Sequence, residues 1–176
     1  MSDPYFSIVD LPVVPLGLRE HYQDIIAKTN TFVPGKGVTE MNYATFAVNE
    51  DLKEWIQDLF DYPVDVNYQL IRAGLKIHKD RAAIYKYNYY ITTGGPDSQI
   101  LWRTKDDPDT IYAALDAQPN TWYKLWVEHH HSVCNVTSPR LSICVVPSHE
   151  GSMKENKLDQ NYFIKLCATI ANKHKS

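Results

Sequence analysis

The sequence is poor in cysteine and lacks any long apolar segment. Its three cysteines, Cys134, Cys144 and Cys167, are odd in number, widely spaced and without a C-x-x-C pair. That pattern argues against a disulfide framework and favours reduced thiols in a cytoplasmic setting. No run approaches the ~20 apolar residues that cross a bilayer. The N-terminal stretch has no basic segment followed by an apolar one, so we expect neither a membrane span nor an export signal.

A large excess of charge of one sign is also lacking. The formal net charge is -3 over 176 residues, so nothing predicts nucleic acid or an anionic membrane as a partner. No repeat, low-complexity tract or Pro/Gly/Ser-rich linker divides the chain. With 44% hydrophobic and 22% charged residues, the composition is typical of a globular protein. We therefore expect one domain over 1–176, and the sequence leaves its oligomeric state open.

The hydrophobic pattern divides this domain into three parts. Over about 1–62 it predicts two helices, one at 18–29 and one that Asn49 caps and Pro63 ends. Over about 64–147, short runs rich in Val, Ile, Tyr and Trp alternate with turn signals, which predicts a β-sandwich or barrel. Over about 156–174, apolar residues at helical spacing predict a closing helix. The expected fold class is mainly β with flanking helices.

Two stretches that contain histidine carry the candidate metal ligands. In "IHKD", His78 and Asp80 stand two residues apart, and on an extended strand such side chains point the same way. Downstream, "EHHHSV" holds three histidines, of which His129 and His131 share one strand face while His130 takes the other. Two imidazoles and one carboxylate on one side of a metal leave positions open, which suits non-haem Fe(II). His129 and His131 are alternatives for the third ligand.

An arginine and a serine follow this histidine run. If the strand after the turn at Ser138 and Pro139 returns antiparallel, Arg140 comes back beneath the metal, with Ser142 on the same face. A guanidinium fork beside a hydroxyl is a receptor for a carboxylate. Together with a metal that has open positions, this receptor suits a dicarboxylate such as 2-oxoglutarate. The keto-acid end would bind the metal, and the far carboxylate would pair with Arg140.

The order His-x-Asp, a long gap, His and then Arg-x-Ser resembles the Fe(II)/2-oxoglutarate-dependent dioxygenases. The "HSVCNVT" run before Arg140 is similar to their prolyl and aspartyl hydroxylase branches, and the resemblance covers about 68–146. It implies a double-stranded β-helix (jelly-roll, cupin-like) core. It implies His78, Asp80 and His131 as iron ligands, with Arg140 and Ser142 holding the distal carboxylate of 2-oxoglutarate. It also implies a hydroxylase that couples 2-oxoglutarate decarboxylation to oxidation of a C–H bond in a small molecule or peptide.

The same resemblance points to two further residues at the cosubstrate. Tyr85 and Asn88 lie in the strand after His-x-Asp, where relatives often supply another hydrogen bond. For the tyrosine, cross-strand aromatic packing is the alternative interpretation. His130 is interpreted as a solvent-facing rim residue. The alternative function is a non-catalytic, cupin-like binding or structural module with an incidental metal.

Overall fold

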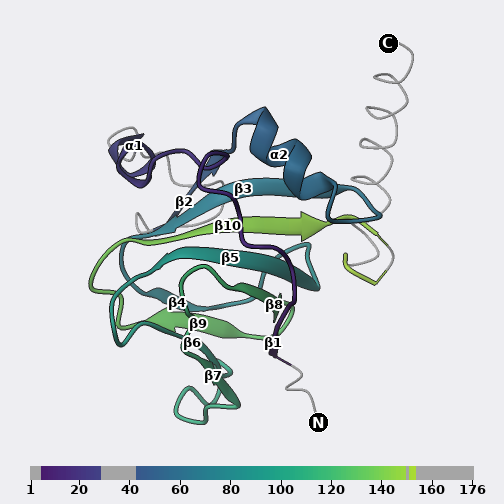
Figure 1. Ribbon diagram of the computed structural model, residues 1–176. Coiled ribbons are helices and arrows are strands. Elements are labelled where there is room, and N and C mark those ends of the chain that lie inside the picture. The colour runs from purple at the N-terminus through teal and green to yellow at the C-terminus, as the bar shows by residue number, and fades with distance from the viewer. Residues whose placement is uncertain (1–4, 29–42, 150, 154–176) are drawn as a thin grey trace.

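A computed structural model describes residues 5–28, 43–149 and 151–153 of the chain. In this part of the chain, two antiparallel sheets face each other (Figure 1). The larger sheet has six strands in the order β1 (Phe6–Ile8), β8 (Trp122–Trp126), β5 (Tyr85–Thr93), β10 (Arg140–Pro147), β3 (Val64–Ile71) and β2 (Tyr43–Ala47). The smaller sheet has four strands in the order β4 (Leu75–His78), β9 (His131–Cys134), β6 (Gln99–Trp102) and β7 (Ala113–Leu115).

The pairing of β3 to β10 follows a nested pattern. The strand β3 pairs with β10, β4 with β9, β5 with β8, and β6 with β7, all antiparallel. The chain therefore forms one long hairpin whose two arms are wound together, so that successive strand pairs alternate between the two sheets. This is the double-stranded β-helix or jelly-roll arrangement. The strand order confirms the predicted fold class.

Strand alternation gives the larger sheet two different faces. On β3, Val64, Val66 and Tyr68 belong to the core under the helices, while Gln69 and Ile71 face the smaller sheet. The helices α1 (Tyr22–Ala27) and α2 (Glu50–Gln57) lie on the outer side of this sheet (Figure 1). The other face of the larger sheet is turned toward the smaller sheet and lines a cavity between them.

The second helix forms as the sequence predicts. The Asn49 side chain accepts a 2.9 Å hydrogen bond from the Leu52 N–H, so Asn49 is the N-cap. Leu52 and Ile56, four residues apart, are both fully buried in the core between the helices and the larger sheet, named here the outer core. A helix anchored in this way covers the larger sheet and leaves its inner face open.

The N-terminal part departs from the predicted pair of helices. The first helix is shorter than 18–29, because 16–19 form turns and α1 starts only at Tyr22. Two strands, β1 and β2, also lie in this part and extend the larger sheet at its two edges. Both are short, three and five residues, so their alternation gives little signal. The helix predicted at about 156–174 lies outside the described residues. No helix in the described ranges combines the length and apolar character needed to span a membrane.

Candidate metal centre

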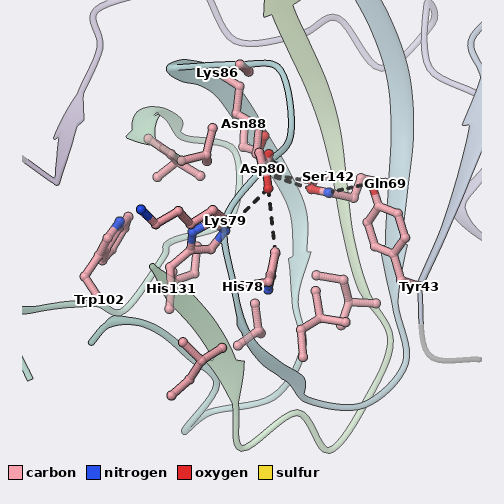
Figure 2. A pocket seen from close by; sticks show the side chains of 18 of the residues that line it. Tyr43, Gln69, His78, Lys79, Asp80, Lys86, Asn88, Trp102, His131 and Ser142 are labelled. Atoms are coloured by element: carbon pink, nitrogen blue, oxygen red, sulfur yellow. Dashed lines mark hydrogen bonds and ion pairs between the residues drawn. The ribbon is translucent and has the colours of Figure 1, made fainter. Parts of the chain in front are cut away.

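Three of the predicted ligands meet where β4 ends and β9 begins. His78 and His131 are direct partners across these antiparallel strands, and their ring centroids lie 4.4 Å apart. Asp80 follows β4, where its backbone N–H donates to the Val127 carbonyl at 2.9 Å. The Nε2 atoms of both histidines lie 3.7 Å from Asp80 Oδ1 (Figure 2). The ligand atoms all lie within 4.8 Å of one another, which is close enough to share one ion.

Backbone carbonyls fix the tautomer of both imidazoles. His78 Nδ1 lies 2.7 Å from the Lys76 carbonyl oxygen, and His131 Nδ1 lies 2.9 Å from that of His129. Because a carbonyl oxygen only accepts, each ring must carry its proton on Nδ1. Nε2 then offers its lone pair toward Asp80, as in histidines that bind a metal. The rings are held in the correct orientation before any ion arrives.

Electrostatics favour an ionised carboxylate beside neutral imidazole. Burial opposes ionisation of Asp80, but the attraction of Lys86 and His131 outweighs it, and the pKa of Asp80 is lowered. Burial, only partly offset by Asp80, lowers the pKa of His131 to about 4. The imidazole of His131 is therefore neutral near pH 7. Deprotonated carboxylate and neutral imidazole are the forms that coordinate metals.

The structure decides between the two alternative histidines. His131 is the first residue of β9 and is buried, with its ring turned toward Asp80. His129 precedes the strand in a bend, is exposed, and packs edge-on against Tyr5 at 5.2 Å between ring centroids. The alternation that placed both on one face does not apply, because 127–130 connect β8 to β9 through a turn at 127–128 and a bend at 129. His130 is half-buried in this connection, and its ring is outside the cluster.

A cavity of about 780 Å³ extends from this cluster between the two sheets (Figure 2). Its walls differ in character. The larger sheet contributes mainly polar side chains, which are Gln69, Lys86, Asn88, Tyr90, Arg140 and Ser142, with Tyr43 beside them. The smaller sheet contributes the two histidines of the cluster and otherwise mainly apolar side chains, which are Leu75, Ile77, Ile100, Trp102 and Val133. A molecule in this cavity therefore meets hydrogen-bonding groups on one side and water-excluding groups on the other.

Arg140 lies deep in this cavity with part of its guanidinium unused. It is the first residue of β10, is only 2% exposed, and lies over the Tyr90 ring at 4.5 Å. Its Nη1 donates to the Thr93 carbonyl at 2.6 Å and to Ser98 Oγ at 3.0 Å. Its Nη2 is buried and has no hydrogen-bond partner among the described residues. A buried donor without a partner is costly, so this nitrogen is suited to an anionic ligand.

Ser142 and Asn88 also face the cavity. Asn88 Nδ2 donates to Gln69 Oε1 at 3.1 Å and lies 3.4 Å from Ser142 Oγ. Asn88 Oδ1 is buried and has no hydrogen-bond partner. Asn88 lies on β5, and Ser142 lies on β10, the neighbouring strand that begins at Arg140. The structure thus places Arg140, Ser142 and Asn88, three residues proposed from the sequence, in the lining of one cavity.

The structure does not bring Tyr85 to this wall. Its side chain packs in the outer core, and its hydroxyl lies 2.6 Å from His149 Nε2. The reason is strand alternation, because residues 85 and 88 have opposite parity on β5 and cannot face the same side. The residues of β5 that face the cavity together with Asn88 are Lys86 and Tyr90, two residues away on either side. The sequence analysis did not identify them. Tyr43 and Gln69 were also missed, since they come from strands that precede the His-x-Asp motif.

Several solved structures resemble this chain, and two of them are described here by name. One, described as a 2OG-Fe(II) oxygenase family oxidoreductase from Burkholderia pseudomallei, is 12% identical with a TM-score of 0.42, covering 69% of this chain and 75% of that one. The other, a prolyl-4-hydroxylase from Pseudomonas putida, is 12% identical with a TM-score of 0.47, covering 80% of this chain and 89% of that one. No protein-family model matches the sequence, and no curated protein matches it either. The jelly-roll assignment rests on the strand order, and the site rests on its own geometry.

Proposed function

We propose that this protein is an Fe(II)/2-oxoglutarate-dependent oxygenase of the hydroxylase type. The observation that carries the proposal is one cavity with two complementary ends. At one end, His78, Asp80 and His131 turn preset ligand atoms toward one point. At the other end, Arg140 offers a buried donor without a partner. A 2-oxo dicarboxylate fits both ends, because it has a chelating keto acid at one terminus and a carboxylate at the other.

The donor set fits iron better than a structural ion. Two imidazole nitrogens and one carboxylate oxygen on one side leave positions open for other ligands, as in non-haem Fe(II) sites. A closed structural zinc site takes four protein ligands, commonly including cysteine. Within the described ranges the cluster has three members, and neither Cys134 nor Cys144 belongs to it. This donor set supports the enzyme over a non-catalytic module whose protein ligands saturate the metal.

Each residue has a definite task in the proposed reaction. Bound Fe(II) with 2-oxoglutarate and O₂ would supply oxidation of a substrate C–H bond, with release of CO₂ and succinate. His78 and His131 hold the ion through Nε2, and Asp80 does so through Oδ1. Arg140 pairs with the distal carboxylate, and Ser142 and Asn88 contribute hydrogen bonds next to it. Trp102 and the other apolar residues of the smaller sheet exclude water from the reacting centre.

Anaerobic titration with Fe(II) and 2-oxoglutarate tests this proposal. We expect a visible charge-transfer absorption when both are bound, and succinate release after air is admitted. His131→Ala should abolish metal binding, whereas His129→Ala, its matched control outside the cluster, should retain it. Arg140→Gln should keep the metal but weaken 2-oxoglutarate binding by roughly a hundredfold, because a buried charge-assisted pair is lost. Equal metal binding by both histidine variants, or no 2-oxoglutarate binding by the wild-type protein, would contradict the proposal.

A further inference from the structure

The cavity is lined by far more positive than negative charge. Among the described residues that line it, the cationic side chains are Lys76, Lys79, Arg81, Lys86, Lys105 and Arg140, whereas Asp80 is the single carboxylate. The chain as a whole has a formal net charge of -3, so this excess of cations is local. Lys86 and Arg140 are buried, and the other four are exposed. The exposed cations therefore lie where the cavity meets solvent.

The proposed cosubstrate accounts only for the charges inside. Asp80 accepts a 3.0 Å hydrogen bond from Lys86, and Arg140 would take the distal carboxylate of 2-oxoglutarate. Of the two negative charges of 2-oxoglutarate, one is on the carboxylate that would chelate the ion and the other is on the carboxylate that would pair with Arg140. Because Arg140 is only 2% exposed, the cosubstrate site is deep, and holding it does not require the exposed cations. The cosubstrate therefore does not account for the exposed cations at the mouth.

Three of these exposed cations, Lys79, Arg81 and Lys105, are named here the rim cations. Lys79 and Arg81 flank Asp80 directly, and Figure 2 shows Lys79 among the side chains that line the cavity. None of the three forms a salt bridge with a carboxylate of the described chain. They therefore do not serve to tie the described elements together.

The rim cations also come together from two separate segments. Lys79 and Arg81 follow β4, and Lys105 follows β6, yet all three line the same cavity. Neither Asp106 nor the nearby Asp107 and Asp109 line the cavity. The side of the mouth that faces the metal cluster is consequently cationic.

We infer that the molecule oxidised at this site is a small anion that bears a carboxylate or a phosphate. The rim cations attract it and hold its charged group at the mouth, while the rest of it extends toward His78 and Asp80. The inference rests on the proposed function. A small ligand fits the geometry, because the cations come from one short turn and one loop position around a cavity of about 780 Å³. An extended polyanion would instead meet a chain of net negative charge.

Binding of small anions to the loaded protein tests this inference. Zn(II) replaces Fe(II) so that no turnover occurs, and 2-oxoglutarate is kept saturating. The probes are inorganic phosphate, N-acetylaspartate and the neutral diamide of N-acetylaspartate, each followed by amide chemical shifts. We expect at least one anion to shift the signals of 79–81 and 105, with an affinity that falls as salt is added. The diamide should not bind, and the anion that binds identifies the charged group.

Two charge-matched variants locate the binding. Lys79→Gln/Arg81→Gln/Lys105→Gln should weaken the anion roughly tenfold, since three favourable surface interactions are lost. Lys28→Gln/Lys53→Gln/Arg72→Gln also removes three positive charges, none of them in the cavity lining, and should bind as the wild type does. Equal loss in both variants, binding of the diamide, or no anion binding would overturn the inference. The inference would also be overturned if the rim variant bound 2-oxoglutarate more weakly but bound the anion as the wild type does. The rim cations would then serve the cosubstrate.

The proposed function is checked separately in the same series. Binding of Zn(II) and 2-oxoglutarate to the wild-type protein is measured first, and its absence counts against the oxygenase alone. The anion titration is then repeated on the metal-free protein. Anion binding that depends on the rim cations there still supports the inference, and its absence counts against it.

Discussion

Lys86 donates a 3.0 Å hydrogen bond to Asp80 Oδ2, and the other oxygen of the same carboxylate faces His78 and His131 at 3.7 Å. The two oxygens of Asp80 are thus divided between a cation of the chain and the candidate metal position. Because Lys86 occupies Oδ2, Asp80 would offer Oδ1 to an ion in the proposed metal centre. Binding through a single oxygen would leave positions around the ion open for a cosubstrate.

Breaking this pair should destabilise the metal-free protein. Lys86 is 8% exposed, so Lys86→Met leaves the carboxylate of Asp80 without its cation in a largely buried place. We expect a loss of about 3 kcal/mol in the free energy of unfolding, measured in urea. Lys53→Met removes an exposed ion pair with Glu50 and should cost less than about 0.5 kcal/mol. Equal effects of the two substitutions would show that the buried pair contributes nothing.

The metal-free protein should lose stability on mild acidification. Folding lowers the pKa of His131 from 6.5 to about 4, so in this range the unfolded chain binds the proton more readily than the folded one. The free energy of unfolding should therefore fall as the pH drops from about 6.5 to about 4. Urea unfolding across this range measures the slope. The side chain of His131→Asn does not titrate, so the slope of unfolding free energy against pH should be smaller by the contribution of one proton. An unchanged slope would contradict the lowered pKa of His131.

Gly94 should be needed for the position of Arg140. Its φ of +91° is unfavourable for other residues, and a Cβ there would lie 2.9 Å from the Arg140 Cβ. Gly94→Ala should cost about 2 kcal/mol of stability and weaken 2-oxoglutarate binding, because the guanidinium is displaced. Gly17→Ala is the control, since an added Cβ there meets nothing within 4 Å. Calorimetric titration of both variants with 2-oxoglutarate and unfolding in urea give the comparison.

The two faces of β5 should respond differently to substitution. Asn88→Ala removes a cavity side chain that hydrogen-bonds Gln69, and we expect 2-oxoglutarate to bind roughly tenfold more weakly. Tyr85→Phe removes the hydroxyl that lies against His149 in the outer core, so it should cost about 1 kcal/mol of stability and leave 2-oxoglutarate binding unchanged. A loss of 2-oxoglutarate affinity in Tyr85→Phe would contradict the observed facing of the strand.

The part of the site that depends on short spacing could be predicted from the sequence. His78 and Asp80 are two residues apart at the end of one strand, so their convergence needs only local geometry. Arg140 could be predicted as well, because a turn signal precedes it and an apolar strand follows it. The choice between His129 and His131 depends on where β9 begins, and that boundary is set by pairing with β4 and β6. Tertiary contacts, not local preference, decide such a boundary.

Two other features needed information that the local pattern does not contain. Lys86 is a buried cation in a run of tyrosines, and only the position of Asp80 explains how its charge is tolerated. The short strands β1 and β2 exist because the larger sheet offers two edges for them to pair with. Side chains alternate between the two faces of β5, so Tyr85 cannot face the same cavity as Asn88, whereas Lys86 and Tyr90 can. Strict application of this alternation would have replaced Tyr85 by Lys86 and Tyr90 among the candidate site residues. That error lay in the interpretation of the pattern rather than in the pattern itself.

The nested pairing of β3 to β10 also has a consequence for biosynthesis. A ribosome that has released β4 and β5 has delivered His78 and Asp80, but their partner His131 arrives only with the returning arm of the hairpin. A polypeptide stopped before β9 has an incomplete set of donors and lacks the strand that joins β4 to β6 in the smaller sheet. Long-range strand pairing of this kind forms slowly. The three donors of the proposed metal centre are therefore together only after β9 has been synthesised and has paired with β4.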